Sequence, residues 1–207
     1  MANIKIYPSI SNSNTKLGTF IGSVNMPQGV TCPADAPCRK GCYATRGNFN
    51  YSNVKEGIYK NYLAYMENPQ QFFDVLHWQL NMLPYRFFRW HGSGDIVDAR
   101  YLEGMCWLAE QHPNTKFLCF TKQYKIVNDY LNEHEKPMNL TIVFSNWMDY
   151  IAPNPHNLPM TYVEFKGADF PLPENALRCS GKCATCVNTE GNCWNLKNGD
   201  SVIMKKH

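Results

Sequence analysis

The amino-acid sequence predicts an α/β fold, either a partial (β/α) barrel or an open, mainly parallel sheet, followed by a Cys-rich metal-binding tail. Two patterns predict it: short apolar runs alternate with amphipathic segments, and seven of the nine cysteines fall into two tight groups. Strands that alternate with helices are typical of βαβ units, whose strands run parallel. A complete eight-unit barrel usually needs about 250 residues, more than the 207 of this chain.

The first half of the chain begins with one predicted strand and two predicted helices. Residues 18–26 are typical of a short strand, and the Pro- and Gly-containing loop that follows, up to residue 50, holds three cysteines. Apolar positions at four-residue steps then predict a helix with its buried face at Val54, Ile58, Tyr62 and Met66. Asn68 and Pro69 form a typical helix start. The inward residues of this second helix are predicted to be Phe72, Phe73, Leu76 and Leu80, with Pro84 ending it.

The second half of the chain alternates regularly between strands and helices. Residues 86–91, 116–121, 140–145 and 160–165 are predicted strands, and residues 98–111 and 124–133 are predicted helices. Cys106 and Cys119 fall inside these apolar segments and are expected in the core. From residue 166 onward no periodicity persists. We therefore divide the chain into a core of residues 1–170 and a metal-binding tail of residues 171–207 that packs on the core.

The composition excludes several classes of protein. Hydrophobic residues make up 44% and aromatic residues 14% of the chain, which excludes a disordered protein. The net charge of +3 is too small to indicate a nucleic-acid partner by itself. No apolar run approaches the roughly 20 residues of a membrane span, and the N-terminal segment lacks the pattern of a signal peptide. We expect no membrane partner and a cytoplasmic location, where cysteines stay reduced and serve metal binding or catalysis.

The first cysteine group lies in the loop after the first predicted strand. Cys32, Cys38 and Cys42 have a C-x5-C-x3-C spacing, on a short loop that no regular element divides. Three cysteines can hold a [4Fe–4S] cluster with one iron open to an outside ligand, which is a catalytic arrangement. A zinc site, completed by a histidine or by a tail cysteine, is the alternative.

The second group lies in the tail and has four members. Cys179, Cys183, Cys186 and Cys193 have a C-x3-C-x2-C-x6-C spacing. Four thiolates can close a coordination shell, which is typical of structural or electron-transferring centres. We favour a second [4Fe–4S] cluster here, with zinc as the alternative. A single site shared by both groups is a third possibility.

Polar residues follow the remaining predicted strands. The carboxyl ends of parallel strands are where α/β proteins gather reactive groups. The polar residues at these ends are His91, Gly92, Ser93, Gly94 and Asp95, then Thr121 and Lys122, then Ser145 and Asn146. His91, Asp95 and Lys122 are the candidate catalytic residues, because they can donate a proton, pair with an ammonium group and hold an anion. The alternatives are a structural His91, an Asp95 that caps the next helix, and a solvated Lys122.

The cysteine loop resembles that of radical S-adenosylmethionine enzymes, because three cysteines follow the first strand and an aromatic residue, Tyr43, follows the last of them. The spacing departs from the usual C-x3-C-x2-C of that superfamily. The chain more closely resembles a bacteriophage and plasmid protein family of unassigned activity that is described as radical-SAM-like. The matching residues are Cys32, Pro33, Cys38, Cys42, Tyr43 and Ala44, then Arg89, His91, Ser93, Gly94 and Asp95, then Phe117, Phe120, Thr121 and Lys122, and the terminal cysteines.

The resemblance implies a radical S-adenosylmethionine enzyme, located in the host cytoplasm if a phage encodes it. The first cluster would bind S-adenosylmethionine and take an electron from a reductant, and Tyr43 would pack on the cluster. Residues 92–95, through Ser93 and Asp95, would receive the amino-acid end of the cofactor. Thr121, Lys122, Ser145 and Asn146 would face the cofactor or an unknown substrate.

Two other functions are compatible with the same residues. One is a non-catalytic, metal-stabilised binding module that acts on protein or nucleic acid. Its support is a basic loop with interleaved aromatic residues, made of Arg39, Lys40, Tyr43, Arg46 and Phe49. The other is an electron-transfer or redox-sensing iron–sulfur protein, in which residues 92–95 would form a turn without a ligand.

Overall fold

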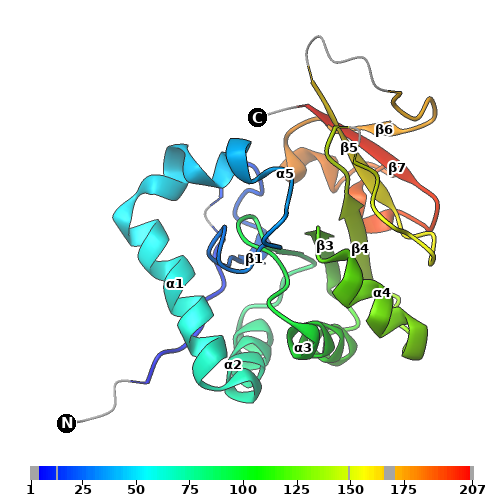
Figure 1. The fold of residues 1–207 in the computed structure, drawn as a ribbon. Coiled ribbons are helices and arrows are strands. Elements are labelled where there is room, and N and C mark those ends of the chain that lie inside the picture. Colours follow the sequence, from blue (N-terminus) through cyan, green and yellow to red (C-terminus); the bar gives the residue numbers. More distant parts are fainter. Residues whose placement is uncertain (1–4, 13, 149, 166–170, 206–207) are drawn as a thin grey trace.

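The computed structural model describes residues 5–12, 14–148, 150–165 and 171–205, and within them seven strands form one sheet (Figure 1). The strand order is β1-β2-β3-β4-β5-β7-β6, and all pairs within this sheet are parallel. The strands are β1 (Ile21–Val24), β2 (Phe87–Trp90), β3 (Lys116–Thr121), β4 (Leu140–Ser145), β5 (Met160–Glu164), β6 (Leu177–Arg178) and β7 (Ser201–Lys205). The predicted α/β class is confirmed, and of the two predicted architectures the protein adopts the open sheet.

The α-helices of the described residues are α1 (Ser52–Glu67), α2 (Pro69–Met82), α3 (Ala99–Gln111), α4 (Tyr124–Glu133) and the short α5 (Cys183–Cys186). The bounds predicted for β3, α4 and β4 are confirmed. So is the start of α2, where the Asn68 side chain accepts a hydrogen bond from the Gln71 N–H at 3.0 Å. Among these residues, no helix has both the length and the apolar character that crossing a bilayer requires.

The predicted buried face of α1 is partly wrong. Met66 is 54% exposed, whereas Asn61 is 4% exposed. The Asn61 side chain is buried because its oxygen accepts a hydrogen bond from the Ser9 N–H and its amide donates to the Asn25 carbonyl. A polar residue thus takes a core position, which periodicity of apolar residues cannot reveal.

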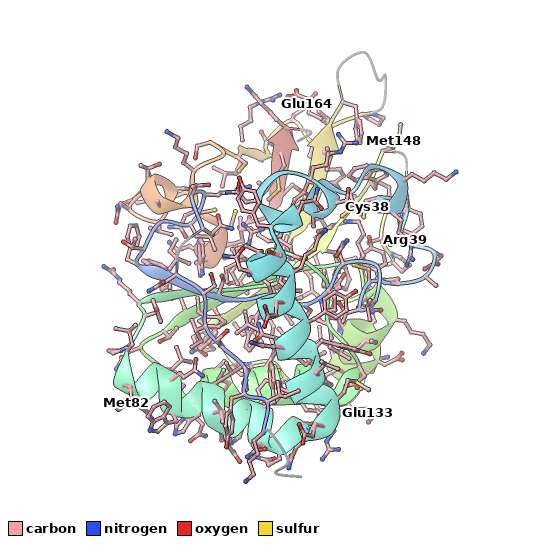
Figure 2. The ribbon with its side chains drawn as sticks, turned by 90° about the vertical axis from the view of Figure 1, so that its left-hand side faces the viewer. Cys38, Arg39, Met82, Glu133, Met148 and Glu164 are labelled. Atoms are coloured by element: carbon pink, nitrogen blue, oxygen red, sulfur yellow. The ribbon has the colours of Figure 1, made fainter. Side chains whose placement is uncertain are left out.

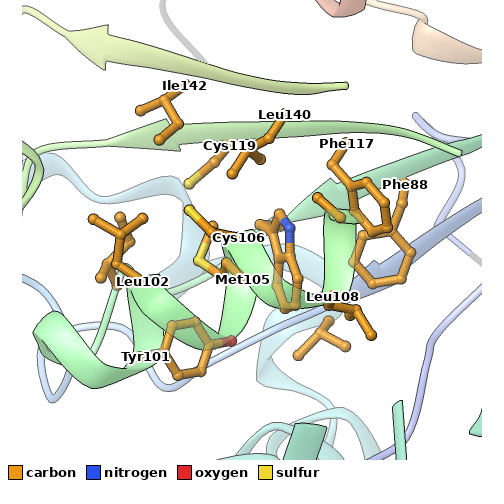
Figure 3. Packing of buried hydrophobic residues seen from close by; sticks show 14 of the residues in the cluster. Phe88, Tyr101, Leu102, Met105, Cys106, Leu108, Phe117, Cys119, Leu140 and Ile142 are labelled. Atoms are coloured by element: carbon orange, nitrogen blue, oxygen red, sulfur yellow. The ribbon is translucent and has the colours of Figure 1, made fainter. Parts of the chain in front are cut away.

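One face of the sheet packs against α1 to α4. Alternate residues of β2, β3 and β4, such as Phe88, Phe117 and Ile142, meet the apolar face of α3 in one continuous core. Figure 3 shows Cys106 of α3 and Cys119 of β3 among these apolar side chains, and both are buried. The prediction that these two cysteines belong to the core is confirmed.

The other face of the sheet is covered by the tail and by the segment before β1. Phe87, Leu118 and Val143 point to this face and pack with Cys193 and Trp194 of the tail. In the tail turn 193–195, the Trp194 indole N–H donates to the Phe88 carbonyl at 3.0 Å, and the Trp194 carbonyl accepts from the Thr141 hydroxyl at 3.1 Å. The tail therefore forms part of the hydrophobic core.

The tail also contributes strands to the sheet, which the sequence analysis did not predict. β7 pairs with β5, and β6 pairs with β7. Both strands are too short to show a periodic pattern of apolar residues in the sequence, since β6 has two residues and β7 has five. The boundary predicted between residues 170 and 171 adjoins residues 166–170, which lie outside the described residues.

The cysteine loop lies at the carboxyl edge of the sheet. In Figure 2, Cys38 and Arg39 lie in the upper half near Met148, whereas Met82 and Glu133, the last residues of α2 and α4, lie at the bottom. Helices that connect parallel strands begin at the carboxyl edge and end at the opposite edge. The predicted gathering place for reactive groups is therefore the end that holds the loop.

Close packing of α2 on α3 makes a direct test of this fold. A Cβ atom added to Gly104 of α3 would lie 2.1 Å from a ring carbon of Phe73, whereas one added to Gly57 of α1 would meet nothing within 4 Å. We predict that Gly104→Ala lowers the free energy of unfolding by about 1–3 kcal/mol through overpacking. Gly57→Ala, the matched control, should raise it by up to about 1 kcal/mol through helix propensity. Urea unfolding measures both, and stabilisation by both variants would contradict this packing.

Candidate functional site

Asp95 joins three segments at the carboxyl edge of the sheet. Its carboxylate accepts hydrogen bonds from the Thr121 hydroxyl (2.5 Å) and the Lys122 backbone N–H (2.8 Å), and its own N–H donates to the Thr31 hydroxyl (2.9 Å). Asp95 is 5% exposed; burial raises its pKa, and the hydrogen bonds from Thr121 and Lys122 oppose that rise. The helix-cap alternative is wrong, because the Asp98 side chain caps α3. Asp95 thus holds the loops after β2 and β3 against the cysteine loop.

The glycines beside Asp95 permit a close approach between two loops. Gly94 has φ +75°, and a Cβ there would lie 2.5 Å from the Met26 carbonyl oxygen. A Cβ on Gly92 would lie 2.7 Å from the Asn25 side-chain oxygen. Between them, the Ser93 hydroxyl donates to the Met26 carbonyl at 3.0 Å. These residues therefore fit the loop after β2 onto the exit of β1, and their predicted cofactor contacts stay a prediction.

The cysteine loop is anchored at both ends of its cysteine segment. Thr31, next to Cys32, receives the Asp95 N–H, and its carbonyl accepts from the Gln123 side chain at 3.0 Å. Beyond Cys42, the Tyr43 hydroxyl donates to the Gly92 carbonyl at 2.7 Å. The loop is thereby tied to the ends of β2 and β3, although its own secondary structure consists of short 3-10 turns.

The three thiols of this loop share one environment. Cys32, Cys38 and Cys42 are half-buried. Burial raises the pKa of Cys32 to about 11, and the charges of Asp95, Cys38 and Cys42 add to the rise. Burial also raises the pKa of Cys38, while the nearby Lys122 ammonium opposes the rise. The fold thus brings together the three cysteines, Asp95 and Lys122, as the sequence analysis expected.

A groove of about 450 Å³ opens between the cysteine loop and the start of α4. Lys122 lies in its wall, with its ammonium nitrogen 6.0 Å from the centre of the Trp147 ring. The Tyr124 and Tyr150 rings, which also line it, stack at a centroid distance of 5.9 Å. The other lining residues are Pro33, Asp35, Ala36, Pro37, Gln123, Lys125, Asn128, Asp129 and Pro153. Sequence reasoning identified Lys122 alone, because the groove is formed by helix α4 together with loops that lie far apart in the sequence.

Ser145 and Asn146 hold the loop after β4. The Ser145 carbonyl accepts from the Tyr124 hydroxyl at 2.5 Å. Asn146 is fully buried, and its side-chain oxygen accepts from the Ala152 N–H at 2.8 Å. The contacts of both residues fix the shape of the groove wall that carries Tyr150, and a direct ligand contact stays a prediction.

His91 lies on the helix side of the sheet. It is 3% exposed, and its ring nitrogens are 3.3 Å from the Tyr101 hydroxyl and 3.7 Å from the Cys119 sulfur. Burial, reinforced by the charge of Arg89, lowers its pKa to about 3, so the ring is neutral at pH 7. Its φ of +56° is unusual for a residue other than glycine. These contacts favour the structural alternative over the catalytic one.

The basic residues of the cysteine loop are exposed. Arg39, Lys40 and Arg46 all lie at the surface, and Arg39 also donates to the Pro33 carbonyl. The Tyr43 and Phe49 rings pack edge to face at 6.0 Å. This aromatic pair holds the loop together, and nucleic-acid binding by it stays a prediction.

The four tail cysteines lie next to one another on the face opposite the helices. Cys183 and Cys186 begin and end α5, and Cys193 begins the following 3-10 turn. Burial raises the pKa of Cys193 to about 12, and the charges of Cys179, Cys183 and Cys186 add to the rise. The tail cysteines thus lie close enough for their charges to act on Cys193, but among the described residues no group of three or more His, Cys, Asp or Glu side chains is arranged to hold a metal ion.

Arg89 is a residue of this region whose role sequence reasoning missed. It is 8% exposed, its guanidinium lies 5.0 Å from the Phe120 ring centre, and one of its nitrogens is 3.8 Å from the Cys183 sulfur. The signal that could have found it is an arginine within the apolar run at 86–91. Half-buried Lys16 lies close by. Burial lowers its pKa, the charge of Arg89 lowers the pKa further, and the charge of Cys183 opposes this.

Comparison with known proteins places the chain in a family. The family model described as GP88, gene product 88, matches residues 8–187. The chain belongs to this family. The GP88 match includes the cysteine loop, the Asp95 segment and Cys179, Cys183 and Cys186, and it ends before Cys193 and β7. No curated protein and no solved structure matches the chain.

The low pKa of His91 predicts a pH dependence of stability. Below pH 6.5 the His91 ring takes up a proton in the unfolded chain, whereas in the folded chain it does so only near pH 3. The free energy of unfolding therefore decreases as the pH is lowered through this window, by up to about 1.4 kcal/mol per pH unit. His91→Asn, whose side chain tolerates the positive φ, should flatten that decline between pH 6 and 5. The control is His134→Asn, which removes one imidazole from an exposed position. Equal slopes for wild type and His91→Asn in urea unfolding would contradict the prediction.

Proposed function

We propose that this GP88-family protein is an iron–sulfur protein of the radical S-adenosylmethionine type. Cys32, Cys38 and Cys42 would hold a [4Fe–4S] cluster, and the four tail cysteines would hold a second metal centre. The observation that carries this proposal is the meeting of three half-buried thiols with Asp95 and Lys122 at the carboxyl edge of a parallel sheet. Open α/β sheets bind their ligands at this edge.

The make-up of the two groups favours iron–sulfur clusters over zinc. Three thiolates are one short of a closed tetrahedral zinc site, whereas three cysteines can hold a [4Fe–4S] cluster with one open iron. Thiolate is also the ordinary protein ligand of such clusters.

Separation along the chain and in the fold supports two centres over one shared site. The loop cysteines follow β1 at the carboxyl edge of the sheet, whereas Cys193 packs on the sheet face opposite the helices.

Each residue around the first group has a defined part in this proposal. A cluster with three cysteine ligands supplies one-electron chemistry and an open iron for the amino-acid end of S-adenosylmethionine. Tyr43 and Thr31 keep the loop on the sheet edge. The Asp95 carboxylate accepts hydrogen bonds from Thr121, Lys122 and Ile96, which leaves about one of its roughly four acceptor positions for a cofactor ammonium. Lys122 offers a cation for a carboxylate in the groove, whose size of about 450 Å³ suits a small molecule.

The first test is metal content and cofactor response. Anaerobically prepared protein should be brown, with near-equal iron and acid-labile sulfide. S-adenosylmethionine should alter the electron paramagnetic resonance signal of the reduced protein, and slow formation of 5′-deoxyadenosine should follow. Cys106→Ala, a core cysteine, is the control that keeps the signal. A colourless, folded, zinc-saturated protein would contradict the iron–sulfur assignment. An unchanged signal at saturating cofactor would instead favour the non-catalytic binding module.

The second test separates the two cysteine groups. Cys38→Ala should leave a folded protein that has lost the cofactor-responsive signal, because the loop is also held by hydrogen bonds at Thr31 and Tyr43. Cys183→Ala should lower the melting temperature by several degrees, because a closed metal centre contributes directly to folding. Thermal unfolding and iron content measure both effects. If the loop variant unfolds and the tail variant keeps its fold, the roles of the groups are reversed.

A further inference from the structure

The cysteine loop concentrates exposed positive charge at the carboxyl edge of the sheet. Residues 31–50 contain three cations, Arg39, Lys40 and Arg46, whose side chains are all exposed, and one acid, Asp35. Among the described residues the salt bridges join other side chains, so no carboxylate there neutralises these three cations. The small net charge of the whole chain therefore conceals a local excess of positive charge.

This charged surface continues from the loop into the groove beside α4. Arg39 donates to the Pro33 carbonyl at 3.3 Å, and Pro33 lines the groove. Lys122 lies in the groove wall, 6.0 Å from the centre of the Trp147 ring. Trp147 in turn reaches the loop, since a Cβ atom on Gly41 would lie 4.0 Å from one of its ring carbons. The loop, Lys122 and the aromatic residues after β4 thus form one continuous surface.

Two acids also line the groove, and they leave its charge positive. Asp129 forms an ion pair with Lys125 at 2.5 Å. Asp35 then stands against two cations, Lys122 in the groove and Arg39 beside it. The positive charge that remains favours an anionic ligand.

Exposed aromatic rings accompany the cations. Tyr150 is 43% exposed and Tyr43 is 44% exposed. The Tyr150 ring stacks on the Tyr124 ring in the groove wall, with an angle of 24° between their planes. The Tyr43 hydroxyl donates to the Gly92 carbonyl, which holds its ring at the surface. Rings that are already held in place lose little conformational freedom when a flat ligand stacks on them.

We infer that the surface formed by the cysteine loop and the groove beside Lys122 binds single-stranded nucleic acid. Phosphates meet Arg39, Lys40 and Lys122, and a base stacks on Tyr150. A positively charged groove with exposed rings suits a single strand, because a base that stacks on a side chain has to leave the stack of a duplex. An acidic peptide would match the cations but offers no flat groups to the rings.

The inferred surface adjoins the first cysteine group. Arg39 and Lys40 lie between Cys38 and Cys42 in the chain, so a bound strand lies next to the three thiols. As the substrate class of the enzyme, nucleic acid rests on the proposed function, whereas the binding itself requires no cluster.

The test measures binding of a fluorescent oligothymidine of about 15 nucleotides, near the upper end of the site size of a single-strand-binding fold. Fluorescence anisotropy at several salt concentrations gives the affinity of the full chain. The duplex of the same oligonucleotide and polyglutamate serve as competitors. Both competitors carry many negative charges, but neither offers unstacked bases.

The variants separate charge from stacking. Arg39→Gln combined with Lys40→Gln removes two cations of the loop, and Tyr150→Ala removes the exposed ring. Tyr150→Phe keeps that ring and is its control. Arg86→Gln combined with Lys116→Gln is the charge control, because it removes two exposed cations at the starts of β2 and β3, on the opposite edge of the sheet.

The wild-type chain should bind the single strand more tightly than either competitor. The Arg39 and Lys40 double variant should lower the affinity about ten-fold and reduce the slope of log affinity against log salt by about 1.4, since each lost phosphate contact contributes about 0.7. Tyr150→Ala should weaken binding about 5- to 150-fold. Tyr150→Phe and the charge control should bind like the wild type. If Tyr150→Ala does not fold, the two charge variants decide.

Three results would overturn the inference: no binding by the wild type, equal losses for the loop variant and the charge control, or equally effective competition by polyglutamate, which would indicate an acidic peptide as the partner. The Cys38→Ala chain should bind like the wild type. A protein that responds to S-adenosylmethionine but binds no strand overturns this inference and leaves the proposed function standing. A protein that binds the strand without that response supports the inference and contradicts the radical S-adenosylmethionine proposal.

Discussion

A parallel sheet has to be covered on both faces, because its strands are apolar on both sides and their connections run outside the sheet. In this protein α1 to α4 cover one face, with Phe88 and Phe117 in the core between them. The opposite face receives no long helix from the described residues. Leu17 and Trp194, from the segment before β1 and from the tail, cover it instead. The tail therefore completes the fold before any metal is considered.

The same parallel arrangement makes the candidate site. Because the strands share a direction, the loops after β1, β2 and β3 emerge at one edge, where buried Asp95 joins them. The Asp95 carboxylate accepts from Thr121 and Lys122 and its backbone N–H donates to Thr31, so this residue links the cysteine loop to the other two loops, together with the contacts of Gln123 and Tyr43. The groove beside Lys122 opens at this same edge.

Covering the second face with a cysteine-rich tail has an electrostatic consequence. β2 points Arg89 toward the tail, and burial removes water from that charge. The guanidinium stacks on the Phe120 ring and lies 3.8 Å from the Cys183 sulfur, so the tail side of the sheet combines aromatic, cationic and thiol groups.

The sequence by itself determined the local elements and the cysteine groups. Periodicity placed α2, α4, β3 and β4, and spacing identified the two groups, because both signals depend on neighbours within a few turns of chain. The sequence also predicted that Asp95, Thr121 and Lys122 lie at one edge, since parallel strands require it. It predicted neither β6 and β7, which are too short to show a period, nor the burial of Asn61 in α1.

Only the tertiary structure decided how Asp95, His91 and Arg89 are used. Asp95 is buried and links loops, and His91 is a neutral core residue, because their partners lie 10 to 64 positions away along the chain. Arg89 meets Cys183 across 94 positions. Such contacts depend on the register of strands and on what covers each face. No local pattern carries that information, because burial and charge compensation arise only after distant segments meet.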